Sequence, residues 1–194
     1  MQIEEGIGTI LLHGNTFLNS LVYNLKGQFQ QKNLLGVLAV LEILKSNGWK
    51  IHKSAIRSVL EKIIIKARWQ ILQQKPLIIC DGAHNLAGMQ YALAELNNIP
   101  AKQQHLILGF TADKEIEKLL QLLPKTAYYY FTNAPQDRAL AAKDLQDLAS
   151  KYALKGATYA NVNLALDACR SQAEEEDSIF IGGSLYLLAD LEEL

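Results

Sequence analysis

Short apolar runs and longer segments of helical period alternate along most of the chain. Four runs, at residues 77–80, 105–108, 127–131 and 178–181, have the length and continuous apolar character of strands that are buried on both faces of a sheet. Each run is followed by a turn signal and then by a segment with apolar positions three and four residues apart. This alternation predicts strands and helices in strict succession.

The helices that this rhythm predicts cover residues 86–96, 114–122, 139–152, 161–174 and 185–191, and residues 157–160 add one further short strand. Strands that alternate with helices form a parallel sheet with helices on both faces. The sequence therefore predicts an α/β, Rossmann-like, mostly parallel domain of about 130 residues from residue 66 onward.

The first 65 residues have a different pattern. A strand is expected at 8–12, a turn at 13–15 and a second extended segment at 17–25, followed by a helix at 30–46 that Gly48 ends. One face of this helix is expected to be buried, and a second helix is expected to begin at Ser54 as its N-cap. The residues of the buried face are Leu34, Val37, Leu38, Leu41 and Leu44. Such a small α+β part cannot easily enclose a core, so we expect it to be the end of a larger domain.

The composition is that of an ordinary globular protein, with 49% hydrophobic and 20% charged residues. No apolar run approaches the roughly 20 residues that cross a bilayer, and the first residues lack a signal peptide's basic and apolar regions. We therefore expect a cytoplasmic protein without a membrane partner. Cys80 and Cys169 are isolated in the sequence, which indicates small buried apolar residues rather than a disulfide or a metal site.

The net charge of −1 is the sum of two opposite parts. Up to Lys75 there are 10 basic and 4 acidic residues, and after it there are 9 basic and 16 acidic residues. Either this is chance drift or the two parts belong to different structural units. The near-zero total argues against nucleic acid as the main partner.

The loop after the first parallel strand carries the densest group of polar side chains. Asp81, Gly82, His84 and Asn85 follow the run at 77–80 directly. In an open parallel sheet, ligands bind at the carboxyl ends of the strands, so Asp81 and His84 are candidates for contacts to a ribose, a phosphate or an amino acid. Gly82 permits a tight turn here, and Asn85 is able to cap the next helix. The alternative is an ordinary strand-to-helix turn in which Asp81 and Asn85 serve only as caps.

Two further loops have weaker signals. Gly182, Gly183 and Ser184 open the last helix, where exposed backbone N–H groups are suited to an anion, although a purely structural Gly-Gly turn fits equally well. In the loop 109–114, Thr111 or Asp113 is expected to cap the following helix, and Lys114 is either a phosphate contact or simply solvated.

Arg68 lies at the seam between the two charge regions, where its planar guanidinium is able to bind phosphate oxygens in pairs or to lie free at the surface. The sequence has no GxxxxGK[ST] and no GxGxxG motif, and it has no HExxH or Ser-His-Asp arrangement. Without a phosphate-binding loop, we do not expect this chain to hydrolyse ATP efficiently by itself.

Five landmarks follow one another in the order of a known family. They are the segment 25–33, Arg68-Trp69-Gln70, the pentapeptide Asp81-Gly-Ala-His-Asn85, the loop 109–114, and Gly182-Gly-Ser-Leu-Tyr186. In this order the chain resembles the folylpolyglutamate synthase/dihydrofolate synthase family of the Mur ligase superfamily, over residues 8–194. The pentapeptide is the most specific element.

The resemblance implies two domains and an activity. Residues 1–65 would be the end of a P-loop ATPase domain, and residues 66–194 would be a domain of the Mur ligase C-terminal type. Family members use ATP to add L-glutamate to dihydropteroate or folate through an acyl phosphate. The Mg ion would be bound mainly by the missing N-terminal ATPase domain, and none of the site residues named for this chain would bind a metal.

Individual roles follow from the motif positions. The resemblance implies that Asn33 lies near the adenine, Arg68 on the ATP phosphates and Asp81 on the ribose, while His84 and Ser184 lie toward the incoming glutamate. Arg68 and His84 are the implied catalytic residues. Ala67 stands where the family commonly has glycine and is expected to stiffen a hinge, and Phe29 stands where the family has histidine and is expected to alter adenine packing.

Without a P-loop part, the resemblance implies either a truncated gene product or a piece cut from a full-length ligase, inactive alone in either case. The alternative from another class is a non-catalytic binding or assembly module derived from the ligase. A free-standing dinucleotide-binding domain is a third interpretation, which the missing GxGxxG disfavours. A monomer is expected, with dimerisation through uncovered apolar residues of the first part as the alternative.

Overall fold

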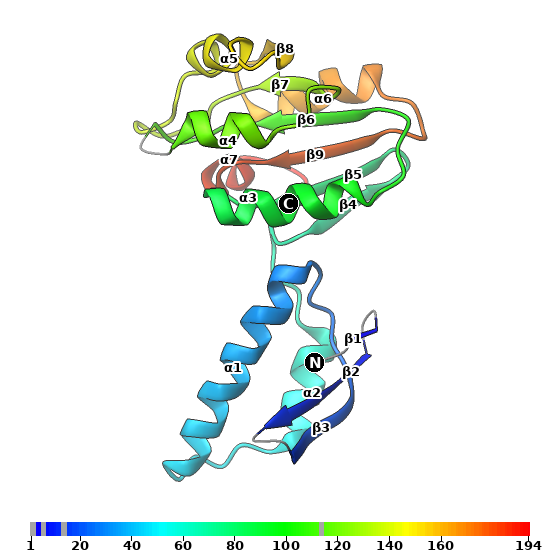
Figure 1. Cartoon of the computed structure of the whole chain (residues 1–194), viewed down its shortest axis with the longest axis vertical. Helices are drawn as coiled ribbons and strands as arrows, with labels where there is room; N and C mark the ends of the chain where they lie inside the picture. Colours follow the sequence, from blue (N-terminus) through cyan, green and yellow to red (C-terminus); the bar gives the residue numbers. More distant parts are fainter. Residues whose placement is uncertain (1–2, 5–6, 13–14, 113–114) are drawn as a thin grey trace. The chain divides into compact units, whose positions relative to one another are not determined.

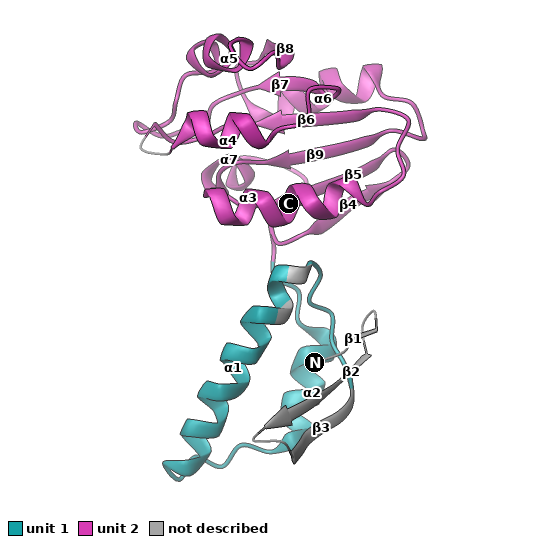
Figure 2. Cartoon of the chain, in the orientation of Figure 1, with its two compact units in different colours: residues 1–65 teal, residues 66–194 magenta. Residues whose placement is uncertain are grey.

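The computed structural model describes residues 3–4, 7–12, 15–112 and 115–194. The chain divides into two compact units, Met1–Ile65 and Lys66–Leu194 (Figure 2). Within the described ranges, none of the helices combines the length and the apolar character that a bilayer span requires.

Unit 2 is built on a six-stranded sheet (Figure 1). In spatial order the strands are β4 (Gln70–Gln74), β5 (Leu77–Asp81), β9 (Ser178–Gly182), β6 (Gln104–Leu108), β7 (Tyr128–Phe131) and β8 (Lys155–Thr158). The strands from β5 to β8 are parallel, and β4 pairs with β5 in the antiparallel direction. The predicted α/β, Rossmann-like, mostly parallel architecture is confirmed.

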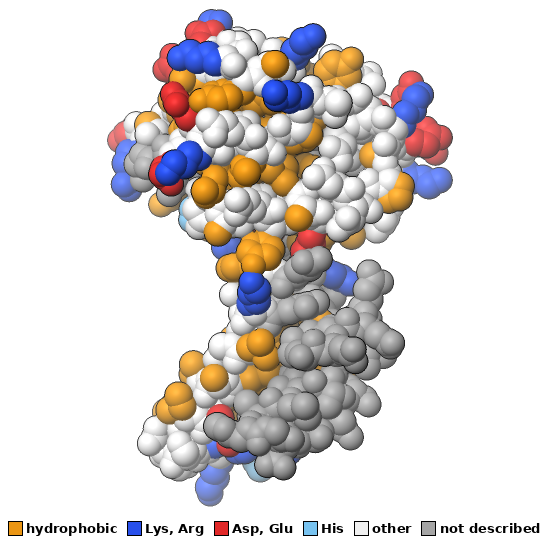
Figure 3. All heavy atoms as spheres, in the orientation of Figure 1, with side chains coloured by type: hydrophobic (Ala, Val, Ile, Leu, Met, Phe, Trp, Pro, Cys, Tyr) orange, Lys and Arg blue, Asp and Glu red, His pale blue; other side chains and the backbone are white. Residues whose placement is uncertain are grey.

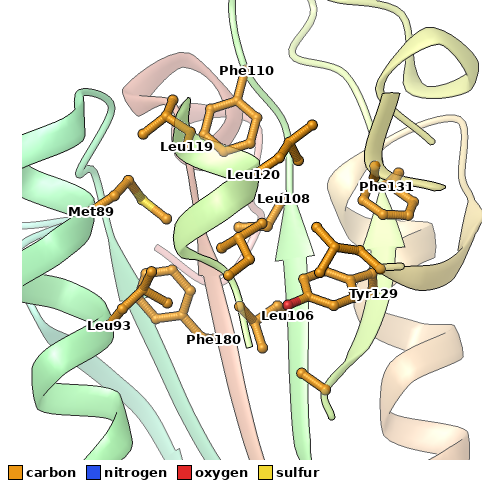
Figure 4. Packing of buried hydrophobic residues seen from close by; sticks show 14 of the residues in the cluster. Met89, Leu93, Leu106, Leu108, Phe110, Leu119, Leu120, Tyr129, Phe131 and Phe180 are labelled. Atoms are coloured by element: carbon orange, nitrogen blue, oxygen red, sulfur yellow. The ribbon is translucent and has the colours of Figure 1, made fainter. Parts of the chain in front are cut away.

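Helices cover both faces of this sheet. On one face lie α3 (Leu86–Asn97), α4 (Ile116–Leu122) and α5 (Ala142–Ser150), and on the other lie α6 (Val162–Gln172) and α7 (Leu185–Ala189). Successive strand residues face opposite sides, so Leu106 and Leu108 join the first core (Figure 4). Ile107, between them, joins the second core. This is why the strands read as unbroken apolar runs.

Two features of unit 2 differ from the prediction. The edge strand β4 has the sequence Gln-Ile-Leu-Gln-Gln and was not expected, because it is only partly buried and lacks an apolar run. Helix α5 begins at Ala142 and not at residue 139, because Ala139 forms a bridge with Thr111 and the Leu140 N–H donates to the Phe110 carbonyl. Contacts with the loop after β6 therefore keep residues 139 and 140 extended, and the helix begins later than predicted.

Unit 1 contains a small antiparallel sheet and two helices. The strands β1 (Ile3–Glu4), β2 (Ile7–Leu12) and β3 (Asn15–Val22) precede α1 (Gln28–Ser46) and α2 (Lys53–Lys62). Gly48 has φ +91°, a left-handed conformation that suits glycine, and it follows the end of α1 as predicted. Residues 13–14 of the predicted turn lie outside the described residues.

The packing of unit 1 corrects two expectations. Leu34 and Leu38 of α1 are buried, but Val37 is 51% exposed, because nothing within the described part of this unit covers that side of the helix. Ser54 is not an N-cap, since α2 begins at Lys53 with His52 before it. Apolar side chains are visible at the surface along α1 (Figure 3).

Candidate functional site

The carboxyl edge of the sheet has a point where neighbouring loops diverge. Strand β9 lies between β5 and β6, which are followed by helices on one face, whereas β9 is followed by α7 on the other. Such a switch in the direction of the connections is where open α/β sheets bind ligands. Asp81 ends β5, His84 lies in the loop after β5, and Ser184 lies in the loop after β9. Because β5 and β9 are adjacent strands, these predicted residues lie at neighbouring positions along this edge.

Asp81 ends β5, and both of its carboxylate oxygens accept backbone N–H groups. Oδ2 accepts the N–H of Trp69 at 2.7 Å, and Oδ1 accepts the N–H of Ala83 at 2.7 Å. These two donors come from different segments, one before β4 and one after β5. The side chain therefore ties the entry of unit 2 to the loop at its carboxyl edge.

Arg68 belongs to residues 67–69, here called the arginine arm. Its Nη1 donates to the carbonyl of Ala67 at 3.1 Å, and the same carbonyl accepts the N–H of Gly82 at 2.9 Å. A Cβ on Gly82 would lie 2.5 Å from Arg68 Nη1 and would also collide with Leu185. A side chain at residue 82 would therefore displace the Arg68 guanidinium and Leu185, and Gly82 does not have a left-handed φ.

The loop after β9 is tightly enclosed. Gly183 has φ +100°, and a Cβ there would lie 2.6 Å from the carbonyl oxygen of Gly109 in the loop after β6. Ser184 is buried, and its Oγ accepts the N–H of Tyr186 at 3.2 Å as the N-cap of α7. The three loops after β5, β9 and β6 therefore meet backbone to backbone.

The remaining predicted residues are placed as follows. His84 is half-buried with Nδ1 2.9 Å from the carbonyl of Gly82, and Asn85 caps α3 as expected by accepting the N–H of Gly88 at 2.8 Å. Thr111 does not cap α4, whose N-cap position is Glu115, because Thr111 is engaged in the bridge to Ala139. Asp113 and Lys114 lie outside the described residues.

Asn33 lies in unit 1, exposed on α1, and its Nδ2 donates to Oε1 of the buried Gln30 at 3.1 Å. Phe29 is also exposed on this helix. Asn33 and Phe29 therefore belong to a different unit from the residues at the carboxyl edge, and their roles toward adenine stay predictions.

The environment of Asp81 sets its protonation. Burial raises the pKa of Asp81 above its ordinary value, while the N–H groups of Trp69 and Ala83 and the charge of Arg68 lower it in part. Burial, together with the charge of Asp81, raises the pKa of the neighbouring Cys80 thiol to about 12. Cys80 and Cys169 are buried free thiols, which agrees with the predicted apolar role.

Trp69 belongs to the landmark Arg68-Trp69-Gln70, but the sequence predicted no role for it. It has φ +45°, its N–H is held by Asp81, and its ring lies 6.4 Å from that of Phe180 in the core of unit 2. No sequence signal marks such a role, because the partner carboxylate is 12 residues away and the donor is a backbone group.

The described residues do not offer a metal site: none of their His, Cys, Asp and Glu side chains form a group of three that would hold an ion.

Comparison with known proteins gives one family. Residues 67–185 match the model described as Mur ligase, glutamate ligase domain. Dihydrofolate synthase/folylpolyglutamate synthase of Escherichia coli is 26% identical over 156 residues, which are 79% of this chain and 36% of that protein. The Bacillus subtilis protein of the same name is 30% identical over 172 residues, 87% of this chain and 39% of that protein.

Solved structures agree in fold. E. coli FolC in complex with ADP, without folate substrate, has a TM-score of 0.81 at 23% identity and covers 99% of this chain, which is 44% of that one. Mycobacterium tuberculosis folylpolyglutamate synthase complexed with ADP has a TM-score of 0.75 at 21% identity over 89% of this chain. The chain thus spans less than half the length of the proteins it resembles.

Proposed function

Because the chain belongs to the Mur ligase family through its glutamate ligase domain, we propose that it is the C-terminal part of an ATP-dependent folate ligase. In this proposal it helps to add L-glutamate to dihydropteroate or folate through an acyl phosphate, and it is inactive without a P-loop domain. Residues 1–65 are then the end of that ATPase domain, and the protein works in the cytoplasm.

One observation carries the proposal at the site. The Arg68 guanidinium lies against Gly82 at the carboxyl edge of β5, next to the loop of Gly183 and Ser184 after β9. An arginine fixed at this edge is suited to neutralise negative charge on a phosphoryl group during transfer. We assign Arg68 to the ATP phosphates, Asp81 to the ribose, and His84 and Ser184 to the glutamate side, and Asn33 of unit 1 to the adenine.

The exposed apolar side of α1 supports the proposal that a further domain covers this helix. Its exposed apolar residues include Leu35, Val37, Val40 and Ile43, between 45% and 60% exposed, although its opposite side already packs in the core of unit 1. A helix with apolar residues on two opposite sides is typical of a helix that is covered on both of them. We assign the cover to the P-loop domain, because more than half of each related ligase has no counterpart in this chain.

The test is complementation. The chain alone, incubated with Mg-ATP, a reduced folate and glutamate, is expected to form no ligated product, and adding the N-terminal P-loop polypeptide is expected to start turnover. In the complemented enzyme, Arg68→Ala should lower the rate on the order of a hundredfold or more, since it removes charge stabilisation from the transition state. Lys155→Ala, an exposed cation at the amino end of β8, is the matched control and should leave the rate unchanged.

Robust ligation by the chain alone would contradict its incompetence, and an unchanged rate in Arg68→Ala would remove Arg68 from the mechanism. If complementation restores binding of the P-loop polypeptide but no ligation, the chain is instead a non-catalytic assembly module derived from the ligase. Light scattering on the same samples distinguishes the expected monomer from a dimer formed through α1.

A further inference from the structure

The arginine arm has an unusual backbone. Ala67 and Trp69, the two residues that flank Arg68, both adopt left-handed conformations, with φ +56° and +45°. For residues with a Cβ this conformation costs free energy and persists only where surrounding contacts impose it. The contacts that hold the arm therefore decide whether Arg68 stays where it is.

Three hydrogen bonds fix the arm to the carboxyl edge of the sheet. The Ala67 N–H donates to Gln70 Oε1 at 3.0 Å, the Ala67 carbonyl accepts the Gly82 N–H, and the Trp69 N–H donates to Asp81 Oδ2 at 2.7 Å. The bond to Asp81 is the only one of the three in which the partner is a charged group. Such bonds are stronger than neutral ones, so Asp81 is the main external restraint on the arm.

We propose that Asp81 is a positioning residue, which holds the arginine arm in its left-handed conformation and so keeps the Arg68 guanidinium against Gly82 at the carboxyl edge. This role goes beyond a contact between Asp81 and a ribose. The use of Arg68 in ligation rests on the proposed function, but the restraint on the arm is a property of this chain alone.

The chemistry requires an aspartate at this position. Each carboxylate oxygen accepts one backbone N–H, and the two donors, on Trp69 and Ala83, lie on different segments. An asparagine has the same shape but only one acceptor oxygen, and its NH₂ group would point a donor at a donor. Asp81→Asn therefore loses one of two hydrogen bonds, either the one to the Trp69 N–H of the arm or the one to the Ala83 N–H of the turn.

Limited digestion with trypsin tests the proposal, because trypsin cleaves after Arg68 only when the arm leaves its place. In Asp81→Asn we expect cleavage of the Arg68–Trp69 bond to become on the order of tenfold faster, since proteolysis follows the population of the open form. Cleavage after Lys151, an exposed residue of unit 2, reports the general susceptibility of the chain to trypsin and should stay constant. Asp167→Asn, which removes an exposed carboxylate from α6, is the matched control.

The proposal is overturned if cleavage after Arg68 is unchanged in Asp81→Asn, or if it rises only in proportion to cleavage after Lys151. Should Asp81→Asn fail to fold, hydrogen exchange of the unmodified chain decides. The Trp69 amide is expected to be protected like the strand amides of unit 2, and exchange as fast as in exposed loops would exclude the restraint.

In the complemented ligase, a double-mutant cycle separates positioning from substrate contact. If Asp81 acts through Arg68 in addition to its ribose contact, Asp81→Asn should slow the Arg68→Ala enzyme by a smaller factor than it slows the unchanged enzyme. Rate losses that multiply would show that Asp81 acts independently of Arg68. Absence of ligation would contradict the proposed function only, since the digestion experiment does not depend on activity.

Discussion

The two units differ in how completely they bury their apolar side chains. Unit 2 has a sheet covered on both faces, with two apolar clusters whose strand residues are almost fully buried. Unit 1 has one small cluster in its described part, which includes Leu34, Leu38, Ile56 and Leu60, while other apolar residues of α1 face outward. The two units therefore have similar apolar content but bury it to different extents.

This difference in burial indicates which unit is stable by itself. Apolar burial is the main favourable contribution to folding, so unit 2, with helices on both sides of six strands, has the contacts of an independent domain. The described part of unit 1 leaves one side of α1 exposed and therefore buries less apolar surface. The comparison predicts that equal substitutions have unequal costs in the two units.

The largest expected effect is the difference in unfolding free energy between replacing a buried leucine and replacing an exposed one. Leu108→Ala on β6, where the side chain is 0% exposed, should lower the free energy of unfolding of unit 2 by about 2–5 kcal/mol through lost burial and a cavity. Leu35→Ala on α1, where the side chain is 45% exposed, should change stability by less than about 0.5 kcal/mol. Urea unfolding followed by circular dichroism measures both, and equal losses would contradict the comparison.

A smaller effect concerns a buried polar group at the amino edge of unit 2. Asp177 accepts N–H groups from Gln103 and Glu174 and lies 3.2 Å from Nε2 of the buried His105. Burial alone would raise the pKa of Asp177, but these partners together hold it below its ordinary value. The carboxylate therefore stabilises the fold above pH 4, and this contribution is lost as the pH falls through the lowered pKa.

We expect Asp177→Asn to lower the free energy of unfolding by about 1–3 kcal/mol at pH 7. The difference in this free energy between the variant and the unchanged protein should become smaller in acid. Asp147→Asn, which breaks an exposed 2.8 Å ion pair with Lys143, should cost less than about 0.5 kcal/mol at either pH. Urea titrations at pH 7 and pH 3 provide the measurement. A gap for Asp177→Asn that stays constant with pH would mean that its charge contributes nothing.

The fold could be predicted largely because its information is local. Strands buried on both faces read as apolar runs, and helix periods follow them, so order and class were correct. The prediction that Val37 is buried was wrong, because periodicity shows which residues share a face of a helix and not whether another element covers that face. Strand β4 was missed because a half-buried edge strand rich in glutamine has no distinctive pattern.

The site was predictable only to the level of loops. The switch in strand connections brings the loops of Asp81 and Ser184 together, as parallel strands require. The bond between Asp81 and the Trp69 N–H was not predictable, because a backbone donor leaves no mark in the sequence. Gly82 was expected to permit a tight turn, whereas in the structure its lack of a side chain leaves space for the Arg68 guanidinium.

The smallest effect lies at the boundary between the units, where Ala67 is buried in the same apolar cluster as Ala165 of α6. Ala67→Gly loses a buried methyl group, worth about 0.8 kcal/mol, and adds freedom to the unfolded chain, but it relieves a left-handed strain of about 1–2 kcal/mol. The net change should lie within about 0.5 kcal/mol of zero. Ala165→Gly suffers the same losses within a helix and relieves no strain, so it should cost about 1.5–2 kcal/mol. Equal losses in the free energy of unfolding for Ala67→Gly and Ala165→Gly would show that the arm stores no strain. In that case Ala67→Gly should also leave the rate of tryptic cleavage after Arg68 unchanged.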